Sequence, residues 1–112
     1  MEWDIVFYVS ASGDTPVADF LLSLSEKERD KCMEYLRILS ERGPRLTSQY
    51  AKHIDGELWE LRPEYGGVEI RLFYFTFVDN LIVILHGFKK KSRKTPRKEL
   101  NLAIKRLKEI KL

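Results

Sequence analysis

The stretch that decides the fold is VEIRLFYFTFVDNLIVILHGF, residues 68–88. Its two apolar segments, 68–77 and 81–88, are separated by Asp79 and Asn80. Such a pair between two runs of β-branched and aromatic residues is typical of a tight β-hairpin. Because both segments are strongly apolar, we expect this hairpin to form the centre of a sheet.

Two further strands are predicted on the N-terminal side of the hairpin. Residues 3–9, WDIVFYV, alternate Trp, Ile, Phe and Val with Asp, Val and Tyr, which is the period of a strand with one strongly apolar face. Residues 56–62, GELWELR, have strand character, and PEYGG after them is typical of a turn. The residues between about 45 and 55 are expected to form a polar loop, in which His53 is a solvated surface residue.

Capping signals place two helices between these strands. Thr15 before a proline is a typical helix start, so residues 16–24 are expected to form a short helix. Ser25 and Glu28 have the spacing of a capping box, and a Gly-Pro pair at position 43 predicts the end of this second helix. Its buried face is expected to consist of Cys32 or Met33, Leu36 and Leu39.

A third helix is expected at the C-terminus. Thr95 and Pro96 repeat the cap-and-proline pattern. One apolar face follows, made of Leu100, Ile104, Leu107 and Ile110. The predicted order is β-α-α-β-β-β-α, an α+β fold with a mostly antiparallel four-stranded sheet, in one domain that spans residues 1–112.

Size and composition favour one compact domain without structural metal or disulfides. The chain has 112 residues, of which 44% are hydrophobic. Its start is acidic rather than basic, unlike a signal peptide, and no apolar run approaches the roughly 18 residues of a membrane span. Its one cysteine, Cys32, has no disulfide partner and no neighbouring metal ligands, so we expect a core residue. We therefore expect a cytoplasmic protein that needs no metal or other cofactor.

Charge is distributed very unevenly along the chain. Residues 1–85 hold 9 basic and 15 acidic residues, whereas residues 86–112 hold 11 basic and 2 acidic ones. Seven of the ten residues 89–98 are Lys or Arg. Basic residues at the start of a helix oppose its dipole, so local stability does not explain them. Such asymmetry indicates a polyanionic partner, nucleic acid first and an acidic protein or anionic membrane next.

Arg71 is the most unusual residue of the central hairpin. Strand alternation places it on one face with Glu69, Phe73, Phe75 and Phe77. Two interpretations stand side by side: an ion pair with Glu69 or Glu60, or a phosphate-binding guanidinium. Arg62 lies in the adjoining strand and is expected to share that face, where both arginines and the lysines after Phe88 would form a concave cationic site.

His86 is the other candidate for chemistry. Alternation places it with Ile82, Ile84 and Phe88, where a histidine is more often a core residue than a catalyst. Its position beside the basic run is the argument for a catalytic role.

Several motifs together resemble a known family. GELWELR, a strand with an internal arginine (EIRLFYF), and ILHGFKKKSRKTPRKEL followed by Ala103 resemble the phage-derived HigB branch of the RelE/ParE toxin superfamily of type II toxin-antitoxin systems. The resemblance covers nearly the whole chain, and it implies the RelE-like, microbial-RNase-like fold. No membrane partner is expected, because the apolar stripe of residues 96–112 is needed to cover the sheet.

The resemblance also implies a function. Such toxins enter the ribosomal A site and cut messenger RNA with its own 2′-hydroxyl as nucleophile, without a metal. It assigns Arg71 and Lys90 to the scissile phosphate. Since no tyrosine follows Tyr74, proton transfer is expected to fall to His86, a lysine or the ribosome. The residues expected to bind RNA are Arg62, Lys89, Lys91, Arg93, Lys94 and Arg97.

The resemblance further implies a small helix-turn-helix antitoxin of the HigA type, through which the pair would bind operator DNA. A rival interpretation is a ParE-like toxin on the same scaffold, which inhibits DNA gyrase by binding and has no catalytic site.

Overall fold

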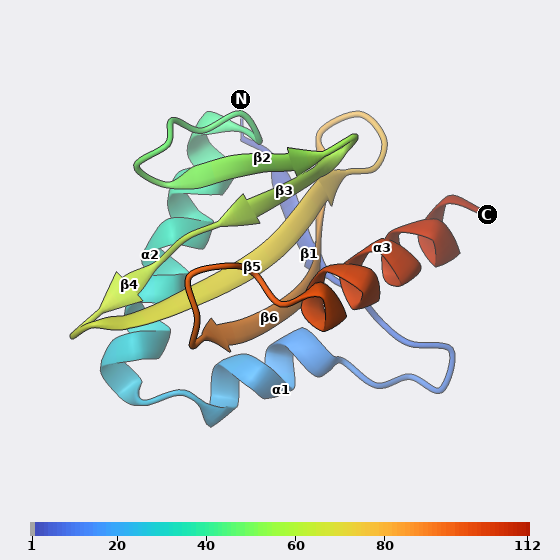
Figure 1. The fold of residues 1–112 in the computed structure, drawn as a ribbon. Helices are drawn as coiled ribbons and strands as arrows, with labels where there is room; N and C mark the ends of the chain where they lie inside the picture. The colour runs from blue at the N-terminus through green and yellow to red at the C-terminus, as the bar shows by residue number, and fades with distance from the viewer. Residues whose placement is uncertain (1) are drawn as a thin grey trace.

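The computed structural model describes residues 2–112 as a single sheet with helices on both faces (Figure 1). The elements, in chain order, are β1 (Asp4–Phe7), α1 (Pro16–Ser23), α2 (Glu26–Arg42), β2 (Ala51–Asp55), β3 (Leu58–Leu61), β4 (Glu64–Tyr65), β5 (Val68–Thr76), β6 (Leu81–Lys90) and α3 (Arg97–Lys111). The strand order is β1-β6-β5-β3-β2, with β4 paired to β5, and only the β1–β6 pair is parallel. The α+β class and the mostly antiparallel sheet are confirmed, and the arrangement is consistent with a RelE-like fold.

The predicted hairpin lies in the middle of the sheet. Strands β5 and β6 are antiparallel from the pair Thr76–Ile82 to the pair Glu69–Lys90. Between them, Asp79 adopts a left-handed conformation with φ of 48°, which an aspartate tolerates better than most residues. The turn closes because the N–H of Leu81 donates to the carbonyl of Val78.

The described chain has six strands, so the predicted number of four is wrong. The segment expected to be a polar loop contains β2, which pairs with β3 and has a register shift between His53 and Asp55. Its apolar pattern is weak because β2 is an edge strand with only Ala51 buried. His53 is exposed as expected, but it lies in this strand and its Nε2 is 2.7 Å from the carbonyl oxygen of Gly56. The other unpredicted strand, β4, is a two-residue strand within the predicted turn.

The helices begin and end close to the residues that their capping signals predict, although Thr15 occupies the N-cap of α1 without a side-chain hydrogen bond to it. Both hydrogen bonds of the Ser25–Glu28 capping box are present, and α2 ends at Gly43. Cys32 is buried, whereas Met33 is 50% exposed. The prediction that Thr95 caps the third helix is wrong: Pro96 occupies the cap position, and the Thr95 hydroxyl instead donates to Glu60 on β3.

Two apolar clusters hold the layers together. α1 and α2 pack on one face of the sheet, and α3 packs on the other (Figure 1). The larger cluster, on the α1/α2 face, includes Cys32, Leu36 and Leu39 from α2 and Ile70, Leu72, Tyr74, Ile82 and Ile84 from the sheet. The smaller one, on the α3 face, joins Phe73, Phe75, Val83, Leu85 and Phe88 to Ala103 and to the predicted stripe of Leu100, Ile104, Leu107 and Ile110.

Within residues 2–112 we find no helix with the length and apolar content that a bilayer crossing requires.

Candidate functional site

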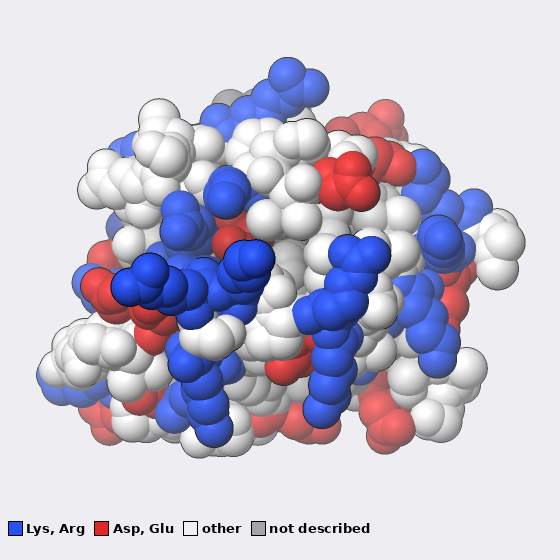
Figure 2. All heavy atoms as spheres, in the orientation of Figure 1, with Lys and Arg blue, Asp and Glu red and all other residues white. Residues whose placement is uncertain are grey.

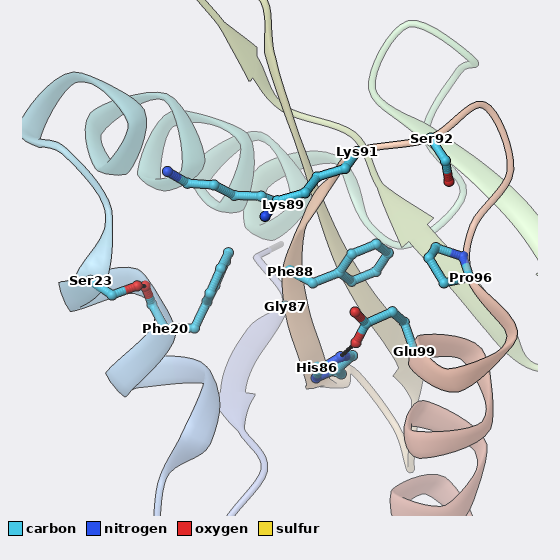
Figure 3. Close-up of a pocket in the computed structure, with 10 residues that line it drawn as sticks. All are labelled: Phe20, Ser23, His86, Gly87, Phe88, Lys89, Lys91, Ser92, Pro96 and Glu99. Atoms are coloured by element: carbon cyan, nitrogen blue, oxygen red, sulfur yellow. Dashed lines mark hydrogen bonds and ion pairs between the residues drawn. The ribbon is translucent and has the colours of Figure 1, made fainter.

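A cleft of about 490 Å³ lies where β6 extends beyond its short neighbour β1. The last residue of β1, Phe7, pairs with Ile84, so the part of β6 that follows has no strand beside it on that edge. Phe20 and Ser23 of α1 form one wall of the cleft, β6 forms its floor, and Pro96 and Glu99 at the start of α3 form the other wall (Figure 3). His86, Gly87, Phe88, Lys89, Lys91 and Ser92 complete the lining.

A bulge in β6 turns His86 toward α3. Phe73 pairs with His86 and the next β5 residue, Tyr74, pairs with Ile84, so Leu85 is an extra residue on β6. Side chains on a strand alternate between faces, and one inserted residue reverses the faces that follow. The prediction that His86 shares a face with Ile82 and Ile84 is therefore wrong, since those two pack with α1 and α2. His86 lies on the α3 face, stacked against Phe73 and Phe88.

His86 is hydrogen-bonded to a carboxylate. Its Nε2 lies 2.7 Å from Oε1 of Glu99 (Figure 3), and both side chains are largely buried. Burial lowers the pKa of His86 below its ordinary value, and the hydrogen bond to Glu99 opposes that effect without reversing it. The imidazole is therefore neutral at pH 7. Since a carboxylate accepts only, the proton of the neutral ring is on Nε2.

The lysines after Phe88 point to different faces. Lys89 pairs with Ile70 and Lys90 pairs with Glu69, so Lys89 lies on the α1/α2 face and Lys90 on the α3 face. Lys89 Nζ is 3.2 Å from Oε1 of Glu28. The backbone N–H of Ser25 is the main cause of a lowered Glu28 pKa, and Lys89 adds to it. Glu28 therefore partly neutralises Lys89, one of the two lysines that line the cleft.

The basic loop supplies cations without such partners. Lys91, Arg93, Lys94 and Arg97 are exposed and make no ion pair with the part of the chain that the structure describes. Lys and Arg side chains gather over the loop between β6 and α3 and along α3 (Figure 2). This surface is attractive to a polyanion.

Arg71 is buried in a separate cluster on the α3 face. Its Nη2 donates to Glu69 at 2.6 Å, and its Nε lies 3.6 Å from Oε1 of Glu60. The Glu60 side chain is only 4% exposed and is also approached by Arg62 at 3.9 Å and by the Thr95 hydroxyl at 3.1 Å. The predicted ion pair is therefore present, with both of the glutamates that were considered.

The predicted residues thus fall into two groups rather than one cationic site. His86, Lys89 and Lys91 line the cleft, whereas Arg71 and Arg62 surround Glu60. The phosphate-binding role of Arg71 and Lys90 stays a prediction. A depression of about 200 Å³ beside Arg71 and Arg62 also contains Glu64 and Glu69, so acidic groups offset its arginines.

Sequence reasoning missed two residues of the cleft, Glu99 and Phe20. Glu60 was predicted as a possible ion-pair partner of Arg71, and the structure confirms that pair. Glu99 had one weak signal in the sequence: it is the only acidic residue between Asp79 and Glu109. Among residues 2–112, no three His, Cys, Asp or Glu side chains gather closely enough to hold a metal ion.

Fold and site together define a small α+β protein with a RelE-like arrangement and a basic cleft that contains a histidine–carboxylate pair. The family model described as phage-derived protein Gp49-like (DUF891) matches residues 19–108, and the chain belongs to this family. The family is related to the HigB/RelE-like toxins. A search of curated proteins finds no match to the chain.

Proposed function

We propose that this protein is the toxin of a type II toxin-antitoxin pair and that it cleaves translated messenger RNA on the ribosome. The observation that carries the proposal is the cleft at the open edge of β6. There a neutral histidine, hydrogen-bonded to Glu99, lines the same cleft as Lys91, the first of the exposed cations that follow β6. Membership of a family related to RelE-like toxins supports the same conclusion. Action on ribosomes implies a cytoplasmic protein.

The proposed reaction needs three things from the protein. The RNA must be held so that its 2′-oxygen is in line with the scissile phosphate, added negative charge must be stabilised, and two protons must move. Cations of the loop hold the RNA backbone, since phosphate contacts fix position. His86 takes the proton of the 2′-hydroxyl as the O2′–P bond forms. The P–O5′ bond breaks, and the leaving oxygen receives a proton from an ammonium group such as that of Lys91. The products are a 2′,3′-cyclic phosphate and a 5′-hydroxyl.

Arg71 could contact the phosphate only after a rearrangement. Of its two carboxylate partners, Glu69 has a side chain that is 44% exposed, whereas Glu60 is nearly fully buried. RNA that displaced Glu69 would expose one edge of the guanidinium for a two-donor phosphate contact. Lys90, opposite Glu69 on the same face, would lie near that phosphate.

The deciding experiment maps 5′ ends of cellular mRNA after expression of the toxin. Cuts inside translated frames, phased with codons, are expected for the wild-type chain and absent for His86→Gln. His53→Gln is the matched control, because His53 is exposed on β2, outside the cleft. Cuts that are unphased, or equally frequent in the His86→Gln strain, would contradict the proposal.

A ParE-like gyrase inhibitor is the second candidate. One observation favours it: the arginine assigned to the phosphate is neutralised by two glutamates. This candidate predicts arrest of growth with intact mRNA and inhibition of purified gyrase.

The proposed partner in the cell is a small helix-turn-helix antitoxin of the HigA type, through which the complex would bind operator DNA. Copurification of the chain with the product of an adjacent small gene tests this partner.

A further inference from the structure

We infer that Glu99 is a positioning residue for proton transfer by His86: it holds the proton on Nε2 and leaves Nδ1 as the nitrogen that receives the proton of the 2′-hydroxyl. The inference rests on the proposed function and goes beyond it by naming the residue that orients the histidine and the nitrogen that reacts.

The hydrogen-bond pattern of His86 is one-sided. Nε2 is bonded to Glu99, whereas Nδ1 has no hydrogen-bond partner among residues 2–112. The ring packs against both Phe73 and Phe88, with centroid distances of 6.5 and 5.7 Å. It nevertheless lines the cleft (Figure 3). A ring nitrogen with a free lone pair, fixed in direction and open to a cleft, has the geometry of a general base.

The alternative role for this pair is mechanical. Glu99 lies in the first turn of α3, so its bond to His86 also fastens the start of that helix to the sheet. A second pair fastens the other end of α3, where Lys111 bonds Glu57 on the β2–β3 turn. Glu57 does not line the cleft, so its substitution weakens the attachment of α3 without affecting the His86 ring. Comparison of substitutions at Glu57 and Glu99 therefore distinguishes helix attachment from ring positioning.

The charges that face His86 set the expected pH dependence. From α3 these are Glu99, whose hydrogen bond and charge raise the pKa of His86, and Arg106, which lowers it. At the cleft the nearby cations are Lys89 and Lys91, whereas the lining residues of α1 and the ring of Phe73 from β5 carry no charge. Loss of the Glu99 charge should therefore lower the pKa of His86 further.

The test compares Glu99→Gln with Glu57→Gln in ribosome-dependent cleavage across pH. Glu99→Gln is expected to lower kcat by a factor on the order of 10 to 100, a share of the roughly 100- to 10,000-fold that a positioned acid or base contributes. KM should change little, and the acidic limb of the rate profile should move to lower pH. Glu57→Gln should lower the melting temperature and leave both kcat and the limb unchanged. Glu99→Asp keeps the charge but retracts the oxygen, so it should lose kcat as well and provides a second variant if Glu99→Gln folds poorly.

The nitrogen-15 shifts of the His86 ring provide a readout that does not depend on cleavage. The wild-type ring should carry its proton on Nε2, and Glu99→Gln should mix the two tautomers, because an amide can accept from or donate to Nε2. A Glu99→Gln protein with the wild-type kcat, the wild-type acidic limb of the pH–rate profile and the wild-type His86 tautomer would overturn the inference. A wild-type protein that cuts no mRNA with ribosomes would overturn the proposed function instead, and the nitrogen shifts would then decide separately whether Glu99 fixes the ring.

Discussion

Arg71 and Glu60 form a buried ion pair in the centre of the sheet: Nε of the arginine lies 3.6 Å from Oε1 of the glutamate, and their side chains are 3% and 4% exposed. The distance is that of an ion pair and not of a hydrogen bond, and Nε has no hydrogen-bond acceptor among residues 2–112. Such a pair is costly to desolvate, and removal of one member leaves the other charge buried without compensation.

Arg71→Ala should therefore destabilise the protein by about 3 to 5 kcal/mol, because Glu60 would lose its closest buried cation. Urea unfolding measures this loss. Arg71→Met combined with Glu60→Leu removes both charges and should recover most of the stability, since apolar residues of similar size often replace a buried pair without loss. A double variant as unstable as Arg71→Ala would contradict this electrostatic account.

The same Arg71→Ala protein decides between the two roles of the arginine. If Arg71 contacts the scissile phosphate, cleavage by the folded fraction should fall by a factor on the order of 100 to 1000, the usual cost of one donor to a developing charge. Arg71→Lys should rescue little, because a point charge cannot reproduce a planar two-donor contact. A folded fraction with full activity would show that the arginine serves the sheet alone.

The basic loop should determine how RNA affinity depends on salt. Replacement of Lys91, Arg93 and Lys94 by alanine should weaken ribosome or RNA binding and flatten the dependence of log K on log salt by about 0.7 for each lost contact with a single strand. Filter binding over a range of salt concentrations measures the slope. The matched control replaces Lys27, Lys31 and Arg37 on α2, outside the cleft, and should leave the slope unchanged.

Much of the fold was readable from sequence because its signals are local. A capping box places the start of α2 directly after Ser25, and Asp79 with Asn80 marks the central hairpin. Strand β2 escaped detection because an edge strand buries little, so its pattern is nearly that of a loop. Thr95 was misassigned because its hydroxyl bonds to Glu60, 35 residues away, in preference to the helix start beside it.

The site was less predictable because two long-range features create it. One extra residue, Leu85, turns His86 to the opposite face, and no sequence pattern marks such a bulge. The partner of His86 comes from α3, so Glu99 joins the site only when that helix packs across the sheet. The positions of the cations in the chain were predictable, whereas the division of Lys89 and Lys90 between faces depends on the strand register.

The stability of the protein should fall as the pH drops below about 6.5, the pKa of a histidine in an unfolded chain. The folded-state pKa of His86 is lowered by burial, so the unfolded chain takes up a proton before the folded one does. Stability is therefore complete above that pH and declines between it and the folded-state pKa. Melting temperatures between pH 7.5 and 5.5 measure the decline. The decline in melting temperature should be absent in His86→Gln and present in His53→Gln. A decline that persists in His86→Gln would show that another group causes it.

The packing of α1 against β6 should make Gly87→Ala destabilising. A Cβ at position 87 would lie 2.7 Å from Cδ2 of Phe20 and 2.7 Å from Cδ2 of Leu72, so one of these side chains must move. Overpacking of this kind costs about 1 to 3 kcal/mol. Because Phe20 forms one wall of the cleft, its displacement should also weaken RNA binding.

Phe20→Ala removes one of the two clashes, so the unfolding free energy of the double variant should fall by less than the sum of the single losses, with a coupling of about 0.5 to 3 kcal/mol. Urea unfolding of the four proteins gives this coupling directly. Strictly additive losses would mean that Phe20 does not pack on Gly87, which would contradict its position in the wall of the cleft.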